Sequence, residues 1–583
     1  MQQHGSFGRS VIVALSLLSA CAAADPSGAA GGDAQTEAAA PQRRGARFVA
    51  PGGAAAFLSG RFAAAEGDMP YAAEEFLKAH AVAPEDVDLR REAFLAALIA
   101  GRPEAAQLAE EETGNPVAAL LLANIEATRG NWDAAARRYA ALPKDGVTGV
   151  LQPLLTAWAE FGAGRPEAAL AQSHPYTDDA RIRGVYTFHD ALIADLAGHE
   201  ADAGRLYQTA QTEFGQPNLD LVRALASWQA RQGQVAEARK TLSAINDMGD
   251  ELAVSVPRLL TDIAVRPVGR ATDGLAASYL AFASLVRQQD SGEFAGVMLR
   301  LALDLRPDMA TARLVAAETL EQNKHPEAAL AMLLPVEASD PLAPSIDLRR
   351  AALEDQLGNT EDALRILDRL SGAYPDRPEP WSLRGAMLRG KHRFAEAADA
   401  YNKALALLGP PVRSHWPLYY ERGIAEERAN QWPAAQADFL EALELSPDEP
   451  SVLNYLGYSW TEQGHDLPRA EKMIERAAEE RPNDGAIVDS LGWVQLRQGH
   501  TAAAVTSLEK AVELEPEDAT VNGHLADAYW AAGRKLDAEY QWRRALTLNP
   551  EPDDAAHFRA RIHEAEQALG VPSDAATTAK AQP

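Results

Sequence analysis

Three short stretches of the sequence carry residue types that could do chemistry. The first, Gly385–His392 (GAMLRGKH), has the G-x-x-x-x-G-K spacing of a phosphate-binding loop. Such a loop needs a Ser or Thr hydroxyl after the Lys to hold magnesium, and a strand before its first Gly. Here His392 follows Lys391, and the preceding residues EPWSLR favour a helix. We therefore expect no nucleotide site at this position.

The second stretch, Ser507–Lys510 (SLEK), has the S-x-x-K spacing of a serine nucleophile with its lysine. It lies in an amphipathic helical segment, so its Ser and Lys are expected on a solvated face. The thirteen histidines contain no H-E-x-x-H pattern, His189 and His199 lack metal-ligand spacing, and no G-x-S-x-G occurs. The sequence predicts a protein that is not an enzyme and uses no metal or cofactor, although a site built from distant segments stays open.

The third stretch surrounds Cys21, the one cysteine among 583 residues. It follows a polar start with Arg9, a short apolar run at 11–18 (VIVALSLL), and the small residues Ser19 and Ala20. The apolar run suits the core of a signal peptide and is too short to span a bilayer. A single Cys excludes an internal disulfide and a Cys-based zinc site. It leaves a buried thiol, a reactive thiol or a modification site, and the residues before Cys21 favour the third.

Leu18-Ser19-Ala20-Cys21 resembles the bacterial lipobox, in which the Cys becomes the lipidated first residue of the mature protein. The resemblance implies a lipid anchor, and Ala22 in place of Asp implies the periplasmic face of the outer membrane rather than the inner membrane. The alternative is an ordinary secretory signal with an incidental Cys. The Ala-, Gly- and Pro-rich residues after Cys21 are typical of a flexible tether.

The formal net charge of −28 bears on the class of partner. Nucleic-acid binding needs a basic footprint, so we expect no nucleic-acid partner and no direct adhesion to an anionic membrane surface. The acidic balance favours solubility and a basic protein partner.

Most of the chain repeats itself with a period of about 34 residues. Prolines close successive segments at Pro482, Pro516 and Pro550. Small residues recur in the first half of each segment, at Ala283, Ala317, Ala351, Gly385, Gly423, Gly457, Gly492 and Ala526. Large apolar residues recur in the second half, at Leu299, Leu333, Leu367, Tyr401, Phe439, Ile474, Leu508 and Trp542. Small residues let two helices approach, and the large residue fills the space between them.

This pattern resembles the tetratricopeptide repeat, a pair of antiparallel helices, over roughly residues 53–552. It predicts an all-α superhelical solenoid of about 14 repeats in two segments, six before an irregular joint and eight after it. The regions expected are a signal peptide at 1–20, the lipidated Cys and tether at 21–52, an N-terminal solenoid at 53–246, the joint at 247–275, a C-terminal solenoid at 276–552, and a capping helix with a disordered tail at 553–583.

In such repeats the first helices line the concave surface. With the small packing residue as position 8, positions 5, 9 and 12 are expected to face this groove, and position 13 lies beside it. The predicted partner-binding residues are Arg389, Tyr420, Glu427, Asn454, Tyr458, Thr461, Asp489, Trp493, Arg497, Asp527 and Trp530. The alternative for the aromatic residues is packing against the next repeat or the capping helix.

The stretch from Trp416 to Leu546 looks like the C-terminal part of proteobacterial tetratricopeptide lipoproteins of similar length. One group of these acts as adaptors on the outer membrane, binding a periplasmic carboxyl-terminal processing protease and delivering substrates such as peptidoglycan hydrolases. The resemblance implies a non-enzymatic scaffold or adaptor with such partners. The alternative is a structural lipoprotein of an outer-membrane polysaccharide-export or secretion assembly. The sequence leaves the oligomeric state open.

Overall fold

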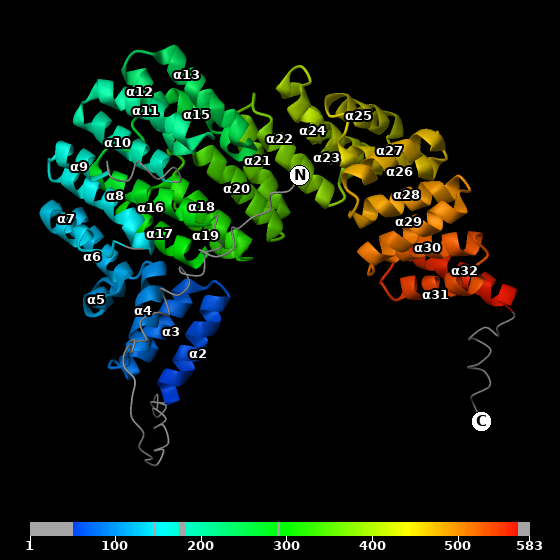
Figure 1. Cartoon of the computed structure of the whole chain (residues 1–583), viewed down its shortest axis with the longest axis horizontal. Helices are drawn as coiled ribbons and strands as arrows, with labels where there is room; N and C mark the ends of the chain where they lie inside the picture. Colours follow the sequence, from blue (N-terminus) through cyan, green and yellow to red (C-terminus); the bar gives the residue numbers. More distant parts are fainter. Residues whose placement is uncertain (1–50, 145, 174–181, 288–291, 570–583) are drawn as a thin grey trace, which may run out of the picture. The chain divides into compact units, whose positions relative to one another are not determined.

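The computed structural model describes residues 51–144, 146–173, 182–287 and 292–569. Figure 1 shows that these residues form helices joined by short turns, and no strand occurs among them. The all-α prediction is therefore confirmed. The predicted signal peptide, Cys21, most of the tether and the end of the tail lie outside the described residues. None of the described helices is long and apolar enough to cross a membrane.

The chain divides into two compact units, one ending at Pro375 and one beginning at Asp376. In unit 1 the described helices are α2 (Pro51–Ala65), α3 (Met69–Val82), α4 (Val87–Ile99), α5 (Glu104–Glu111), α6 (Pro116–Thr128), α7 (Trp132–Ala140), α8 (Gly146–Gly162), α9 (Pro166–Ser173), α10 (Arg183–Ala197), α11 (Glu200–Phe214), α12 (Leu219–Arg231), α13 (Val235–Ser243), η2 (Ala244–Met248), α14 (Asp250–Ala253), α15 (Val256–Thr261), α16 (Ala271–Arg287), α17 (Gly292–Leu305), α18 (Ala310–Gln322), α19 (Pro326–Leu333), α20 (Ala343–Gln356) and α21 (Thr360–Ala373).

In unit 2 the described helices are α22 (Glu379–Gly390), α23 (Phe394–Leu408), η3 (Arg413–His415), α24 (Trp416–Arg428), α25 (Trp432–Leu445), α26 (Pro450–Gln463), α27 (Leu467–Glu480), α28 (Gly485–Arg497), α29 (Thr501–Leu514), α30 (Ala519–Ala531), α31 (Lys535–Leu546) and α32 (Pro552–Leu569).

Consecutive helices pair as antiparallel hairpins. The described residues contain six hairpins from α2 to α13, three from α16 to α21, and five from α22 to α31. The predicted six and eight repeats agree with this pairing. The short elements η2, α14 and α15 interrupt the pairing near the predicted joint, which lies inside unit 1. The proposed domain boundaries themselves stay a prediction.

The turns between paired helices need a left-handed backbone. Gly499 between α28 and α29 has a φ of 82°, a conformation that costs Gly least. His392 occupies the corresponding turn between α22 and α23 with a φ of 59°. The Gly-Lys-His stretch is therefore a helix end and a turn, and Gly385 lies within α22, as the sequence predicted.

The small residues allow close approach inside each hairpin. A Cβ at Gly385 would lie 2.6 Å from Tyr401, and a Cβ at Gly492 would lie 2.5 Å from Leu508. Both large residues are essentially fully buried, and so is Trp542. The predicted pairing of a small residue with a large one is thus the core of each repeat in unit 2.

Unit 1 also packs onto itself between segments far apart in the sequence. Helix α16 lies along α8, and α17 contacts α4 and α6. The glycine of the α2–α3 turn, Gly67, closely approaches His325 at the start of α19. The hydroxyls of Tyr139 on α7 and Tyr279 on α16 both donate to Asn124 Oδ1, at 2.6 Å and 2.9 Å. Helices of the later hairpins therefore occupy the surface of the earlier ones.

The contact between α8 and α16 is centred on Trp158. Its indole is fully buried, and its Nε1 donates to His189 Nδ1 at 2.9 Å. Burial lowers the pKa of His189 to about 3, so this ring stays neutral and accepts the bond. A Cβ at Gly274 on α16 would overlap the Trp158 indole. The indole is held by His189 and cannot easily move aside.

Gly274→Ala is therefore expected to destabilise unit 1 by about 1–3 kcal/mol, because the added methyl group overpacks this contact. Gly296→Ala on the neighbouring helix α17 is the matched control, since nothing lies within 4 Å of its added Cβ. The control is expected to stabilise the helix by about 0.5–1 kcal/mol. Urea unfolding followed by circular dichroism measures both, and equal stabilisation by the two alanines would contradict the close contact.

Candidate functional site

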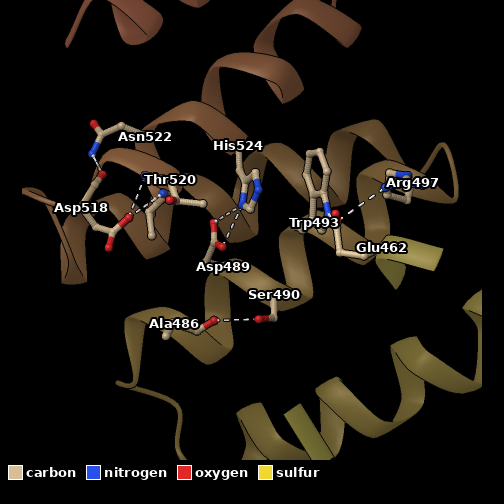
Figure 2. A network of polar contacts seen from close by, with 11 residues as sticks. Glu462, Ala486, Asp489, Ser490, Trp493, Arg497, Asp518, Thr520, Asn522 and His524 are labelled. Carbon is tan, nitrogen blue, oxygen red and sulfur yellow. Dashed lines mark hydrogen bonds and ion pairs between the residues drawn. The ribbon is translucent and has the colours of Figure 1, made fainter. Parts of the chain in front are cut away.

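The first helices of the hairpins in unit 2 carry the predicted partner-binding residues. These helices are α22, α24, α26, α28 and α30. Figure 2 shows the central part, where side chains of α28 and α30 meet around Trp493 and His524. The predicted residues fall into a central cluster, two residues on α26, and two flanking groups. The groups differ in how many contacts their side chains already make within unit 2.

The central cluster is built on the Trp493 indole. The His524 ring stacks on it with centroids 4.1 Å apart and an interplanar angle of 15°. Trp493 Nε1 donates to Glu462 Oε1 at 2.6 Å. The Arg497 guanidinium lies 5.7 Å from the indole centroid and 3.6 Å from Glu462. Trp493 is half-buried and held by three neighbours, so it enters a contact with little further loss of side-chain freedom.

The His524 ring of this stack forms a buried ion pair with Asp489. His524 Nδ1 lies 2.8 Å and 3.1 Å from the two carboxylate oxygens of Asp489, which is 6% exposed. Burial of the His524 ring opposes its protonation, but the charge and hydrogen bond of Asp489, with Asp527 and Glu462 further off, outweigh this effect. The pKa of His524 is therefore raised above its ordinary value.

Helix α26, which carries Glu462 of the cluster, also carries the predicted residues Tyr458 and Asn454. Burial, and then the charges of Glu462, Asp489 and Asp554, raise the pKa of Tyr458, so its phenol stays protonated and able to donate. Asn454 Oδ1 is buried and has no hydrogen-bond partner among the described residues. Both are half-buried residues on the first helix of a hairpin, as predicted.

The first flanking group, toward α22, is largely engaged within unit 2. Tyr420 packs on Tyr455 with centroids 5.9 Å apart and on Phe439 at 6.1 Å. Arg389 pairs with Glu421 at 2.7 Å. Glu427 Oε2 accepts from the Tyr455 hydroxyl at 3.2 Å. These side chains hold neighbouring hairpins together.

The second flanking group lies on α26 and α30. Thr461 is fully buried and donates to Gly457 O in its own helix, so it presents no surface to a partner. Asp527 Oδ1 accepts from Trp542 Nε1 at 3.0 Å. Trp530 lies 5.8 Å from Trp542, and Arg561 of α32 stands 5.0 Å above it. For Trp530 the structure therefore shows packing against its own hairpin and against α32.

His524 and Glu462, which hold Trp493 in place, are not among the residues predicted from the sequence. The sequence spacing could have indicated the pair of His524 and Asp489. The two residues are 35 positions apart, which is one repeat plus one position. An acid and a base at adjacent inner positions of consecutive repeats are brought face to face when the repeats stack. The spacing alone does not say which of several neighbours each one contacts.

The hairpins and their small-residue packing define the structure as a tetratricopeptide-repeat solenoid. The family model described as tetratricopeptide repeat matches residues 348–409, 420–485 and 490–551. Stacked repeats of this kind form extended surfaces that bind other proteins. The matched residues lie at the end of unit 1 and in unit 2, where the family model supports the tetratricopeptide repeats.

Several known proteins are similar to parts of it. Tetratricopeptide repeat protein 13 of Homo sapiens is 33% identical over 106 residues, which are 18% of this chain and 12% of that protein. The match thus spans only a small part of that relative. A tetratricopeptide repeat protein from Parabacteroides merdae is similar at 15% identity and a TM-score of 0.35, over 43% of this chain and 97% of that one.

Two further solved structures are similar at low identity. The APC/C hetero-tetramer Cut9-Hcn1 matches at 14% identity and a TM-score of 0.37, over 88% of this chain and 96% of that one. YrrB, described as a TPR protein with an unusual peptide-binding site, matches at 18% identity and a TM-score of 0.27, over 33% of this chain and 97% of that one.

The pair of His524 and Asp489 predicts a pH-dependent contribution to stability. A raised folded pKa gives stability that is fully present below the unfolded value of about 6.5 and is lost as pH rises through the folded value. His524→Gln is therefore expected to lower the free energy of unfolding more at about pH 6 than at about pH 9. Each unit of raised pKa corresponds to about 1.4 kcal/mol.

The matched control for this prediction is Gln463→Ala, since Gln463 is exposed at the end of α26 and carries no titratable group. Its effect on the free energy of unfolding should be small and nearly the same at both pH values. Urea titrations of both variants and the parent protein give the comparison. If the cost of His524→Gln were independent of pH, the assignment of a stabilising charged pair would be wrong.

Proposed function

We propose that this protein is a non-enzymatic scaffold or adaptor that binds periplasmic protein partners on unit 2 while a lipid on Cys21 holds it to the outer membrane. The tetratricopeptide repeats support the scaffold part of the proposal. The lipobox resemblance supports the anchor. The likeness to adaptor lipoproteins supports a carboxyl-terminal processing protease and cell-wall hydrolases as the partners.

The observation that carries the proposal is the half-buried Trp493, held by His524, Glu462 and Arg497 on the first helices of unit 2. Aromatic side chains fixed in this way are the usual anchors of protein interfaces, each contributing about 2 kcal/mol or more when a partner covers them. Tyr458, on the same helix as Glu462, adds a protonated hydroxyl that can donate to a partner. A backbone carbonyl of an extended partner segment could accept from this hydroxyl.

A membrane anchor would hold such a scaffold, and the partners bound to it, at one bilayer surface. Each buried CH₂ of an acyl chain contributes about 0.8 kcal/mol, so a multiply acylated Cys holds a protein stably at a bilayer. Two partners bound to one anchored chain meet at a raised effective concentration without any new contact between them. An enzyme and its substrate would thereby be brought together by a protein that does no chemistry itself.

Trp493→Ala is expected to weaken partner binding at least tenfold, because about 1.4 kcal/mol corresponds to tenfold in affinity and a buried anchor exceeds that. Tyr540→Ala is the matched control, since Tyr540 is 66% exposed on the second helix of its hairpin. Both variants should keep their helix content. Partners are first identified by mass spectrometry on immobilised protein, and their affinities are then measured one by one.

Tyr458→Ala and Asn454→Ala extend this test to the two predicted polar residues of α26. Unchanged affinity in all three variants would remove the binding assignment from this surface. A retained partner that proves to be a processing protease or a cell-wall hydrolase supports the adaptor. Stable co-purification with an integral export protein would instead favour a structural component of an assembly.

Cys21→Ser is expected to release the protein from the membrane fraction, because the thiol that would carry the lipid is gone. Fractionation of cells expressing the parent and the variant measures this, and intact mass shows the missing acyl groups. Ser19→Ala, which keeps a small residue before the Cys, should leave both lipid and location unchanged. Membrane retention of the Cys21→Ser protein would contradict the lipid anchor.

A further inference from the structure

Unit 1 contains a cleft of about 220 Å³ that no part of the proposed function uses. Its walls come from the turn between α4 and α5, from α5 and α6, and from the end of α17. Early and later hairpins of unit 1 therefore meet at this cleft, as the contact of α17 with α4 and α6 shows.

Most of the cleft is apolar. Leu98, Leu121 and Leu305 line it and are each less than a tenth exposed. Ile125 and Ala106 add further hydrocarbon surface. Such walls favour an aliphatic or aromatic body, with about 25 cal/mol gained for each Å² of apolar surface removed from water.

One buried polar group at the cleft is left unsatisfied. Asn124 lines the cleft, is 3% exposed, and accepts the hydroxyls of both Tyr139 and Tyr279 on its Oδ1. Its Nδ2 has no hydrogen-bond partner among the described residues. Since both tyrosines donate to the oxygen, the orientation of the amide is fixed and the NH₂ group must find another acceptor. An unpaired buried donor costs about 1–3 kcal/mol.

A carboxylate also lines the cleft. Asp304 lines the cleft at the end of α17, and its Oδ1 accepts from Arg300 Nε at 2.8 Å. At the rim, Arg102 pairs with Glu104 at 3.0 Å. Each charge is thus matched by an opposite one, and the cleft has no net charge to offer an ion.

We propose that this cleft binds a small uncharged molecule that has an aliphatic or aromatic body and one group able both to accept from Asn124 and to donate to Asp304. Alcohols, phenols and primary amides have this chemistry. The volume is below the roughly 300–1,000 Å³ of pockets for drug-sized ligands, so the ligand is of single-ring size. All the residues that line the cleft belong to unit 1.

Phenol and toluene are the probes, because they share a ring and differ in the hydroxyl group. Ligand-observed NMR and calorimetry on the full chain are expected to show saturable phenol binding at concentrations on the order of mM, typical of a ligand with so few atoms. Toluene should bind at least tenfold more weakly. Equal affinity for the two probes, or no saturable binding of phenol, would overturn the proposal.

Ala106→Phe fills the cleft and is expected to reduce phenol affinity at least tenfold. Gln107→Phe places the same side chain on the exposed face of α5 and should leave the affinity unchanged. Ile125→Phe fills the cleft from α6 and replaces Ala106→Phe if that variant unfolds. Phenol binding that survives a folded, filled cleft would place the ligand elsewhere and overturn the assignment.

Discussion

The structure depends on the close approach of two helices where one carries a small residue and the other a large one. In unit 2 this contact sets each hairpin, as between Gly385 and Tyr401 or Gly492 and Leu508. Because interiors pack like crystals, a single added methyl group is felt at such a contact. The repeat period, the turn positions and the buried aromatic residues all follow from the need to make this contact many times.

In unit 1 a close contact between a small and a large residue also joins helices that are far apart in the sequence. The Trp158 indole on α8 approaches Gly274 on α16 as closely as the large residue approaches the glycine within a hairpin of unit 2. The later helices of unit 1 thereby cover the surface that its early hairpins would otherwise present. Unit 2 instead keeps half-buried aromatic and polar side chains on its first helices, and Trp493 is the best held of them.

Several charged side chains of unit 2 lie around Trp493 and the His524 ring that stacks on it. The strongly acidic chain places Glu462, Asp489 and Asp527 near one imidazole, and His524 pairs with the most buried of them. An acid with so little exposure would be costly without such a partner. The ion pair positions the ring on which the indole stacks, so electrostatics and aromatic packing here fix the same side chain.

The helices, their pairing and the small-to-large contacts of each repeat could be predicted from the sequence, because they depend on residues within about one 34-residue period. The sequence also placed Trp493, Tyr458 and Asn454 on the first helices of unit 2. It did not determine that Tyr420 packs on Phe439 and Tyr455, that Thr461 is closed off, or that Trp530 lies against Trp542 and beneath α32. Nor did it show that α16 covers α8, or that His524 neutralises Asp489. These contacts could be seen only in the folded chain, since they depend on how the hairpins pack and rotate against one another. A small rotation per repeat changes which side chains meet.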